Sequence, residues 1–225
     1  MGLILNIETS SEVCSVCLAK DGVLIDYRQD TTGNSHAKVL TVFIHELFAA
    51  GGLSMNMLDA VAVSAGPGSY TGLRIGTSVA KGLCYALNKP LIAVPTLKSL
   101  GAGIRKAANK ATACYLPLLD ARRMDAYAVV LNANLEDVTT LDCVTLNEEF
   151  EKSLKALGEI YIGGNAMEKC KKIFTSHQFS YIPHVTCNSR DMVELSHERF
   201  LNAAFENTAY FEPFYLKEFS SKTKL

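Results

Sequence analysis

A glycine-rich segment holds the residues best placed to bind or react. It runs from Ser64 to Gly76 with the sequence SAGPGSYTGLRIG, after an apolar run at 60–63 and before a helix-like stretch at 73–88. A strand that turns through glycines into a helix leaves backbone N–H groups unpaired at the helix N-terminus. Such groups suit a carboxylate, a phosphate or the polar groups of a partner protein. The segment therefore predicts either an anion site or a protein docking site.

Known catalytic motifs do not fit this segment. A dinucleotide G-x-G-x-x-G pattern starting at Gly66 would need glycine where Thr71 stands, and a Walker phosphate loop would need lysine after Gly72. A serine nucleophile elbow would need glycines two residues on either side of Ser69, at the positions of Pro67 and Thr71. We therefore interpret Ser69 as a turn or helix-capping residue rather than a nucleophile.

The histidines and cysteines give no pattern typical of metal or redox chemistry. His36 and His45 are nine residues apart, which places them on opposite sides of a helix, so they cannot share a metal. Cys14 and Cys17 lie in a strand-like segment, where residues three apart point to opposite faces, whereas a redox pair opens a helix. We expect no metal site, and we expect the seven cysteines to be free thiols.

The first half of the chain predicts the elements that position the glycine-rich segment. Asp21-Gly22 is a strong hairpin signal, and Asn34 and Ser35 offer a cap for a following helix. The order βββαβαβα is that of the ribonuclease-H-like lobe of actin, sugar kinases and Hsp-type chaperones. We expect strands at 3–8, 13–19, 23–30, 60–65 and 91–94, and helices at 36–50, 73–88 and 96–109.

The second half repeats this theme imperfectly, which predicts two related lobes. The predicted fold class is α/β, a two-lobed actin-like and ribonuclease-H-like ATPase fold with mixed sheets flanked by helices. Residues 1–108 would form the N-terminal ribonuclease-H-like lobe and residues 109–225 the related C-terminal lobe, with a single sheet carrying long insertions as the alternative. We expect strands at 114–120, 127–131, 138–144 and 159–162, and helices at 147–157, 166–174 and 190–209.

The composition argues against several classes of protein. The chain has 225 residues, of which 48% are hydrophobic and 20% charged, and charged or polar residues interrupt every apolar run before it reaches membrane-spanning length. The first charges are acidic, Glu8 and Glu12, so we expect no secretory signal and a cytoplasmic protein. A net charge of −1 argues against strong RNA binding by the chain alone, because phosphate neutralisation needs clustered Lys and Arg.

The stretch at 66–76 resembles the signature of the TsaB (YeaZ-like) family, and three further stretches match that pattern. They are ILNIETS at 4–10, LLDAR at 118–122 with Ala126-Tyr127, and PFYLK at 213–217. The resemblance implies a dimerisation subunit of the bacterial machinery that places threonylcarbamoyl on the adenosine beside the tRNA anticodon. It implies a non-catalytic protein that binds and stabilises the catalytic subunit TsaD, permits docking of the ATPase subunit TsaE, and meets tRNA only through the complex.

Two helices are the expected contact with that partner. The helix at 36–50 is apolar on more than one side, which is typical of a helix covered by more than its own sheet. Gly72, Gly76 and Ala80 recur at four-residue spacing, which predicts a groove where another helix approaches closely. In TsaB relatives this pair of helices contacts TsaD; the alternative is that the two helices only pack on each other. The expected interface consists of His36, Leu40, Phe43, Gly68, Ser69, Tyr70, Thr71, Gly72, Arg74 and Gly76.

A nucleotide site of the actin-like type is present only in part. Glu8-Thr9-Ser10 stands where actin-like ATPases carry a phosphate loop with an Asp, and its carboxylate is one methylene longer. Asp120 opens the second phosphate loop, which lacks the usual glycines. Gly163-Gly164 resembles an adenosine-binding turn, with a plain strand-to-helix turn as the alternative. The degenerate nucleotide set is Glu8, Thr9, Ser10, Asp120, Gly163 and Gly164.

These features leave two functions open. The first is the non-catalytic subunit, with no cofactor of its own. ATP at a seam with the partner, and a homodimer when the partner is absent, both stay open. The alternative is a stand-alone ATPase or small-molecule kinase on the same fold, which would bind Mg-ATP tightly through Glu8 and Gly163.

Overall fold

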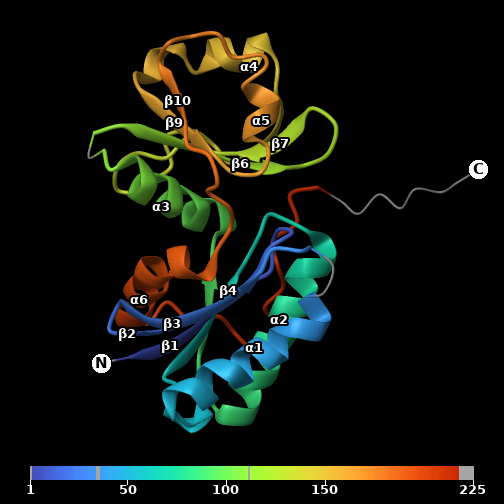
Figure 1. The fold of residues 1–225 in the computed structure, drawn as a ribbon, viewed down its shortest axis with the longest axis vertical. Helices are drawn as coiled ribbons and strands as arrows, with labels where there is room; N and C mark the ends of the chain where they lie inside the picture. Colours follow the sequence, from blue (N-terminus) through green and yellow to red (C-terminus); the bar gives the residue numbers. More distant parts are fainter. Residues whose placement is uncertain (1, 34–35, 111, 218–225) are drawn as a thin grey trace, which may run out of the picture.

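Two five-stranded mixed sheets, one in each lobe, organise the computed structural model, which describes residues 2–33, 36–110 and 112–217 (Figure 1). The first sheet has the order β3-β2-β1-β4-β5. Within it, β1 pairs antiparallel with β2 and parallel with β4, so the sheet is mixed as predicted. Its strands are β1 (Leu3–Glu8), β2 (Cys14–Lys20), β3 (Val23–Asp30), β4 (Ala60–Ser64) and β5 (Leu91–Val94).

Helices cover both faces of the first sheet, which explains why its central strands are apolar runs. α1 (His36–Gly51) and α2 (Tyr70–Leu87) lie side by side on one face (Figure 1). α6 (Val193–Leu201) lies on the other face, preceded by the 3-10 helix η3 (Ser189–Met192). Another 3-10 helix, η1 (Met55–Met57), leads into β4, whose five residues are all buried.

The second sheet has the order β10-β9-β6-β7-β8. α3 (Thr96–Ala108) packs on one face, whereas α4 (Glu148–Ser153), η2 (Lys155–Leu157) and α5 (Met167–Cys170) pack on the other. Each face therefore has its own apolar cluster. The strands are β6 (Cys114–Asp120), β7 (Asp125–Ala128), β8 (Asp142–Thr145), β9 (Ile160–Gly163) and β10 (Phe179–Tyr181).

Most first-half elements match the predicted ranges, and the larger differences lie in the second half. The strand predicted at 127–131 is β7 and ends at Ala128, because the chain then leaves the ladder and Leu131 forms isolated bridges with Tyr115 and Asp137. β10 was not predicted, since a three-residue strand carries too little periodicity to detect. The predicted cap residues Asn34 and Ser35 lie outside the described residues.

The long helix predicted at 190–209 is also wrong. The segment forms η3 and then α6, which ends at Leu201. Ala203 adopts a left-handed φ of 51°, which stops the helix. The Glu206 N–H then donates to the carbonyl oxygen of Leu91 at the edge of the first sheet. The sequence of residues 202–209 is compatible with a helix, but the hydrogen bond from Glu206 to the sheet edge draws the backbone out of a helical conformation.

The chain crosses between the lobes more than once. It leaves the first sheet after β5, enters α3, and returns through η3 to α6, which contacts β1 and β5. The last helix therefore packs on the first sheet although it follows the second sheet in sequence. The boundary between residues 108 and 109 stays a prediction.

Candidate functional site

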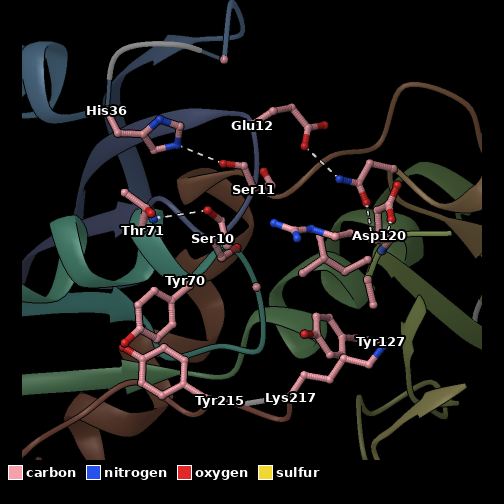
Figure 2. A pocket seen from close by; sticks show the side chains of 18 of the residues that line it. Ser10, Ser11, Glu12, His36, Tyr70, Thr71, Asp120, Tyr127, Tyr215 and Lys217 are labelled. Atoms are coloured by element: carbon pink, nitrogen blue, oxygen red, sulfur yellow. Dashed lines mark hydrogen bonds between the residues drawn. The ribbon is translucent and has the colours of Figure 1, made fainter. Parts of the chain in front are cut away.

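A cleft of about 1070 Å³ lies between the two lobes (Figure 2). The first lobe lines it with residues 10–12, the start of α1 and residues 68–72. The second lobe contributes the β6–β7 turn at 119–123, and the segment 215–217 lines a further part of the wall. The glycine-rich segment and the LLDAR stretch, which are more than forty residues apart in the chain, therefore meet in one place.

The glycine-rich loop fits closely against the turn that follows β1. The Ser69 N–H donates to the carbonyl oxygen of Ser10 at 2.6 Å. Ser69 Oγ accepts a hydrogen bond from the Gly72 N–H at 3.3 Å, which makes Ser69 the N-cap of α2. A Cβ at Gly68 would overlap the Ser10 carbonyl oxygen. The prediction that Ser69 is a helix-capping residue is confirmed.

The small-residue stripe of α2 points inward, so the predicted groove for another helix is wrong. A Cβ at Gly72 would overlap the carbonyl oxygen of Thr9, and a Cβ at Gly76 would overlap Thr9 Oγ1. Ala80 is fully buried in the first core. These residues are small because α2 packs directly against the turn after β1. Leu40 of α1 is also fully buried in that core and presents no surface to a partner.

A different face of the same helix pair reaches solvent. Ser69, Thr71 and Arg74 are exposed, whereas His36, Phe43 and Tyr70 are half-buried. Two apolar side chains that the expected interface set leaves out lie on this face, Val42 of α1 at 49% exposure and Tyr85 of α2 at 89%. Gly82 is exposed as well, and a Cβ there would meet no atom within 4 Å. Once the inward side of α2 is known, the periodicity of the helix places Gly82 and Tyr85 on the outward side.

Arg74 is held at one edge of this face by aromatic side chains. Its guanidinium lies 4.2 Å from the centroid of the Tyr70 ring, and its Nε donates to the Tyr215 hydroxyl at 3.4 Å. The Tyr70 and Tyr215 rings are 4.9 Å apart (Figure 2). Near the start of α1, His36 Nε2 donates to the Ser11 carbonyl oxygen at 2.9 Å, which joins α1 to the cleft wall.

The carboxylate of Glu8 is turned into the protein. Glu8 is completely buried, its Oε1 accepts from the Ser10 N–H at 2.6 Å, and it is not among the residues that line the cleft. Burial is the main cause that raises the pKa of Glu8, and hydrogen bonds from Ser10 and Ser64 oppose it only in part. Of the Glu8-Thr9-Ser10 set, only Ser10 lines the cleft. The Glu8 carboxylate therefore stabilises the turn that follows β1 and does not face the cleft.

Asp120 does line the cleft, but its carboxylate is already paired. Its Oδ1 accepts from the Arg122 N–H at 2.6 Å and from Lys169 Nζ at 2.7 Å. The backbone N–H of Asp120 donates to Asn165 Oδ1, and Asn165 Nδ2 donates to Glu12 Oε2 at 2.8 Å (Figure 2). This chain of contacts ties the first lobe to the second. Sequence reasoning missed Glu12 and Asn165, which become neighbours only when the lobes assemble.

The glycine pair of the second lobe serves packing. Gly163 ends β9, and a Cβ there would lie 2.7 Å from Ile104 Cγ1 of α3. Gly164 has a φ of +106°, and a Cβ there would overlap the Leu118 carbonyl oxygen. The geometry is that of a strand-to-helix turn leading to α5, which was the alternative interpretation. Neither glycine lines the cleft.

The acidic, histidine and cysteine side chains and the helix lengths of the described ranges bear on metal, redox and membrane roles. No three His, Cys, Asp or Glu side chains there are placed to hold a metal ion together. The seven cysteines are free, and burial raises the pKa of both Cys14 and Cys17 to about 12, so neither thiol ionises at neutral pH. No helix within 2–33, 36–110 and 112–217 combines the length and apolarity that crossing a bilayer requires.

Comparison with known sequences gives consistent matches. A family model described as "TsaD: tRNA N6-adenosine threonylcarbamoyltransferase" matches residues 30–224. The Escherichia coli (strain K12) protein named tRNA threonylcarbamoyladenosine biosynthesis protein TsaB is 34% identical over 124 residues, covering 55% of this chain and 52% of that protein. A tRNA N6-adenosine threonylcarbamoyltransferase of Novosphingobium aromaticivorans is 31% identical over 194 residues, covering 75% and 55%. The chain thus spans about half the length of these curated relatives.

Comparison with solved structures supports the fold. YeaZ from Pseudomonas aeruginosa superposes with a TM-score of 0.84 at 21% identity, covering 96% of this chain and all of that one. The inorganic polyphosphate/ATP-glucomannokinase from Arthrobacter sp. strain KM superposes with a TM-score of 0.51 at 11% identity, covering 90% and 100%. At such identities the likeness concerns the fold alone. The predicted two-lobed actin-like fold is therefore confirmed.

Proposed function

This chain belongs to the family described as TsaD: tRNA N6-adenosine threonylcarbamoyltransferase, in which it is a TsaB (YeaZ-like) member, and on this premise we propose that it is a non-catalytic complex subunit. The complex would transfer threonylcarbamoyl to the adenosine next to the tRNA anticodon in the cytoplasm. The chain's role is to bind and stabilise a TsaD-like catalytic subunit. A TsaE-like ATPase subunit would dock on the complex, and tRNA would bind mainly to the partners, since this chain has a net charge of −1.

The burial of Glu8 is the observation that carries the non-catalytic assignment. In an actin-like ATPase the carboxylate after the first strand faces the nucleotide and its Mg²⁺. Here that position is fully buried, and one carboxylate oxygen is bonded to the N–H of Ser10 within the same turn. Among the carboxylates that do line the cleft, Asp120 pairs with Lys169, Asp125 pairs with Lys217, and Glu12 accepts a hydrogen bond from Asn165. These contacts use the cleft carboxylates to hold the walls of the cleft together, which supports a structural rather than a metal-binding role for them.

The outward face of α1 and α2 is the proposed docking surface. It combines half-exposed Val42, almost fully exposed Tyr85 and the stacked Arg74. Tyrosine and arginine are enriched at interface positions that dominate binding energy. An interface with the catalytic subunit would bury on the order of 1,600 Å² in total. Without that subunit, the same face suits pairing with a second copy of this chain.

Co-purification with the TsaD-like subunit tests this proposal, using two exposed valines as a matched pair. Val42 lies on the proposed surface, whereas Val23 lies on the edge strand β3 at 68% exposure. Val42→Asp would place a charge in the interface and should weaken capture of the partner by tenfold or more, about 1.4 kcal/mol. Val23→Asp should leave capture unchanged. Equal capture by both variants, or no capture by the wild type, would contradict the proposal.

The stand-alone ATPase remains the second candidate because the cleft is large and contains Ser10, Asp120 and Arg122. Calorimetric titration of the purified chain with Mg-ATP distinguishes the two functions. The subunit proposal expects no tight binding by the chain alone, while ATP held at the seam with the partner would appear only in the complex. Tight binding that is lost on Asp120→Ala, or turnover by the isolated chain, would favour the ATPase.

A further inference from the structure

The end of the described chain, residues 211–217, runs along the first lobe and then reaches the second. We call this segment the strap. At its start, Lys81 Nζ of α2 donates to the carbonyl oxygens of Ala209 and of Phe211, the first residue of the strap, at 3.1 Å each. Phe211 packs against the core of the first lobe. The Phe214 N–H donates to the Ala65 carbonyl oxygen at 2.7 Å. The strap is therefore anchored beside α2 and the glycine-rich loop.

The crossing to the second lobe takes place within one peptide bond. Tyr215 still belongs to the first lobe, through its ring contact with Tyr70 and its bond from Arg74. Leu216 packs against the apolar cluster between α3 and the second sheet. Lys217 Nζ pairs with Asp125 Oδ2 of β7 at 2.7 Å (Figure 2). Because consecutive Cα atoms are only about 3.8 Å apart, the lobes cannot separate here while both sets of contacts hold.

The strap begins beside one of the other two crossings, because Phe214 lines a small cavity together with Pro95 and Leu97, and it then turns toward the cleft. The other two crossings join β5 to α3, between Val94 and Leu97, and return the chain from Val185 to Met192. α3 packs on η3, so these two crossings lie together. Neither of them lines the cleft, whereas residues 215–217 do. Beyond Phe214 the strap follows a path of its own, and in Figure 1 its red end points toward the β6–β7 side of the second sheet. Two adjacent crossings permit a hinge, and a third at the cleft restrains it.

The two ends of the strap differ in strength. Its first-lobe end combines backbone hydrogen bonds, a buried-core contact and an aromatic pair. Its second-lobe end has one partly buried leucine and Lys217, which meets the Cys143 side chain and forms an ion pair with Asp125, with 43% of the Lys217 side chain and 30% of the Asp125 side chain exposed. An ion pair this exposed is screened by water and stabilises the docked end only weakly. The second-lobe end is therefore the one that can open while the rest of the protein stays folded.

We propose that the strap is a releasable clasp across the cleft, which holds the two lobes at one separation when Leu216 and Lys217 are docked and lets them move apart when these residues leave. The clasp acts on the lobes whether or not a partner is bound, so it does not depend on the proposed function. This role gives a reason for the chain to reach the second lobe again after α6 has packed on the first sheet.

Hydrogen exchange and small-angle scattering of the full chain test the clasp. Lys217→Glu places a like charge beside Asp125. It should speed exchange of the peptides that cover 10–12 and 120–125 by about fivefold and increase the radius of gyration. Lys172→Glu makes the same charge change at an exposed second-lobe lysine, for which no ion pair is found among the described residues, and should do neither. Adding Asp125→Lys to Lys217→Glu should restore slow exchange.

Two further measurements keep the test decisive. Leu216→Ala removes the apolar half of the docked end and should speed exchange in the same peptides without a charge change. Raising salt on the wild type should do so too, because an exposed ion pair is screened. If Lys217→Glu and Leu216→Ala both leave exchange in these peptides and the radius of gyration at the values of Lys172→Glu, the clasp is overturned. If one variant unfolds, its peptides that cover β1 and β4 will also exchange fast. The other variant then provides the test.

Discussion

The two sides of α2 contain glycines with opposite surroundings. Gly76 is buried against Thr9, whereas Gly82, about 240° further around the helix, faces open space. The first glycine is needed because the turn after β1 leaves no room for a side chain. The second lies on the outside of the molecule, where a side chain would meet solvent close to Tyr85. The same residue type in one helix thus records packing within the chain on one side and an open surface on the other.

The largest effect should come from enlarging the inward glycine. Gly76→Leu forces atoms into Thr9, a stiff β-branched residue in a fully buried turn, and should lower the free energy of unfolding by about 3 kcal/mol or more. Gly82→Leu is the matched control and should be neutral or stabilising by up to about 1 kcal/mol, since leucine is a better helix former than glycine. Urea denaturation measures both. Equal losses in the free energy of unfolding of the two variants would show that the two sides of α2 do not differ in packing.

A smaller effect, on binding rather than folding, is expected on the outward side. Gly82→Trp places a large ring on the outward side of α2 and should reduce affinity for the TsaD-like subunit by about tenfold or more while the chain stays folded. Gly82→Ala adds only a methyl group and should keep affinity close to that of the wild type. Surface plasmon resonance against the immobilised partner compares them. Full binding by the tryptophan variant would mean that the partner does not cover this part of α2.

The smallest effect concerns the turn on which the inward glycines rest. Because burial raises the pKa of Glu8, the folded protein holds this proton more tightly than the unfolded chain does. Wild-type stability should therefore fall as the pH rises from the usual glutamate range through the raised pKa. Glu8→Gln keeps an oxygen that can accept from the Ser10 N–H and removes the charge.

Thermal unfolding across pH measures this effect. Glu8→Gln should match the wild type in acid and exceed it at neutral pH, with the melting temperature rising by about 2–4 °C for each kcal/mol gained. A variant that is less stable at neutral pH would mean that the ionised carboxylate stabilises the turn, and that the inward side of α2 rests on a charged group.

Local sequence patterns predicted the first lobe well. Apolar runs bounded by turn signals gave β1, β4 and β5 close to their observed ends, and the Asp21-Gly22 signal gave the β2–β3 hairpin. Ser69 was identified as a cap because Ser is preferred there and the following residues are helical. The strands of the second lobe were harder to predict, since β7, β8 and β10 are short. The helix predicted at 190–209 was too long, because Glu206 pairs with Leu91 at the edge of the first sheet.

The candidate site was predicted only in outline. The glycine-rich segment and Asp120 do meet at the cleft, yet Leu40, Gly72 and Gly76 were placed on a partner surface and lie inside. A helix that is apolar or small on two sides does not reveal from its own periodicity which side its sheet covers. The contact from Glu12 to Asn165 joins residues far apart in sequence, and no local pattern announces it.

The sequence by itself determined the secondary structure of the first lobe, the two-lobed fold class and the family, because hydrophobic period, turn chemistry and motif spacing are properties of neighbouring residues. Only the tertiary structure decided which side of α2 is inside, that Glu8 is turned away from the cleft, and that the strap ties the lobes together. Each of these depends on which distant segments fill the same space, and steric exclusion and burial settle that only once the whole chain has packed.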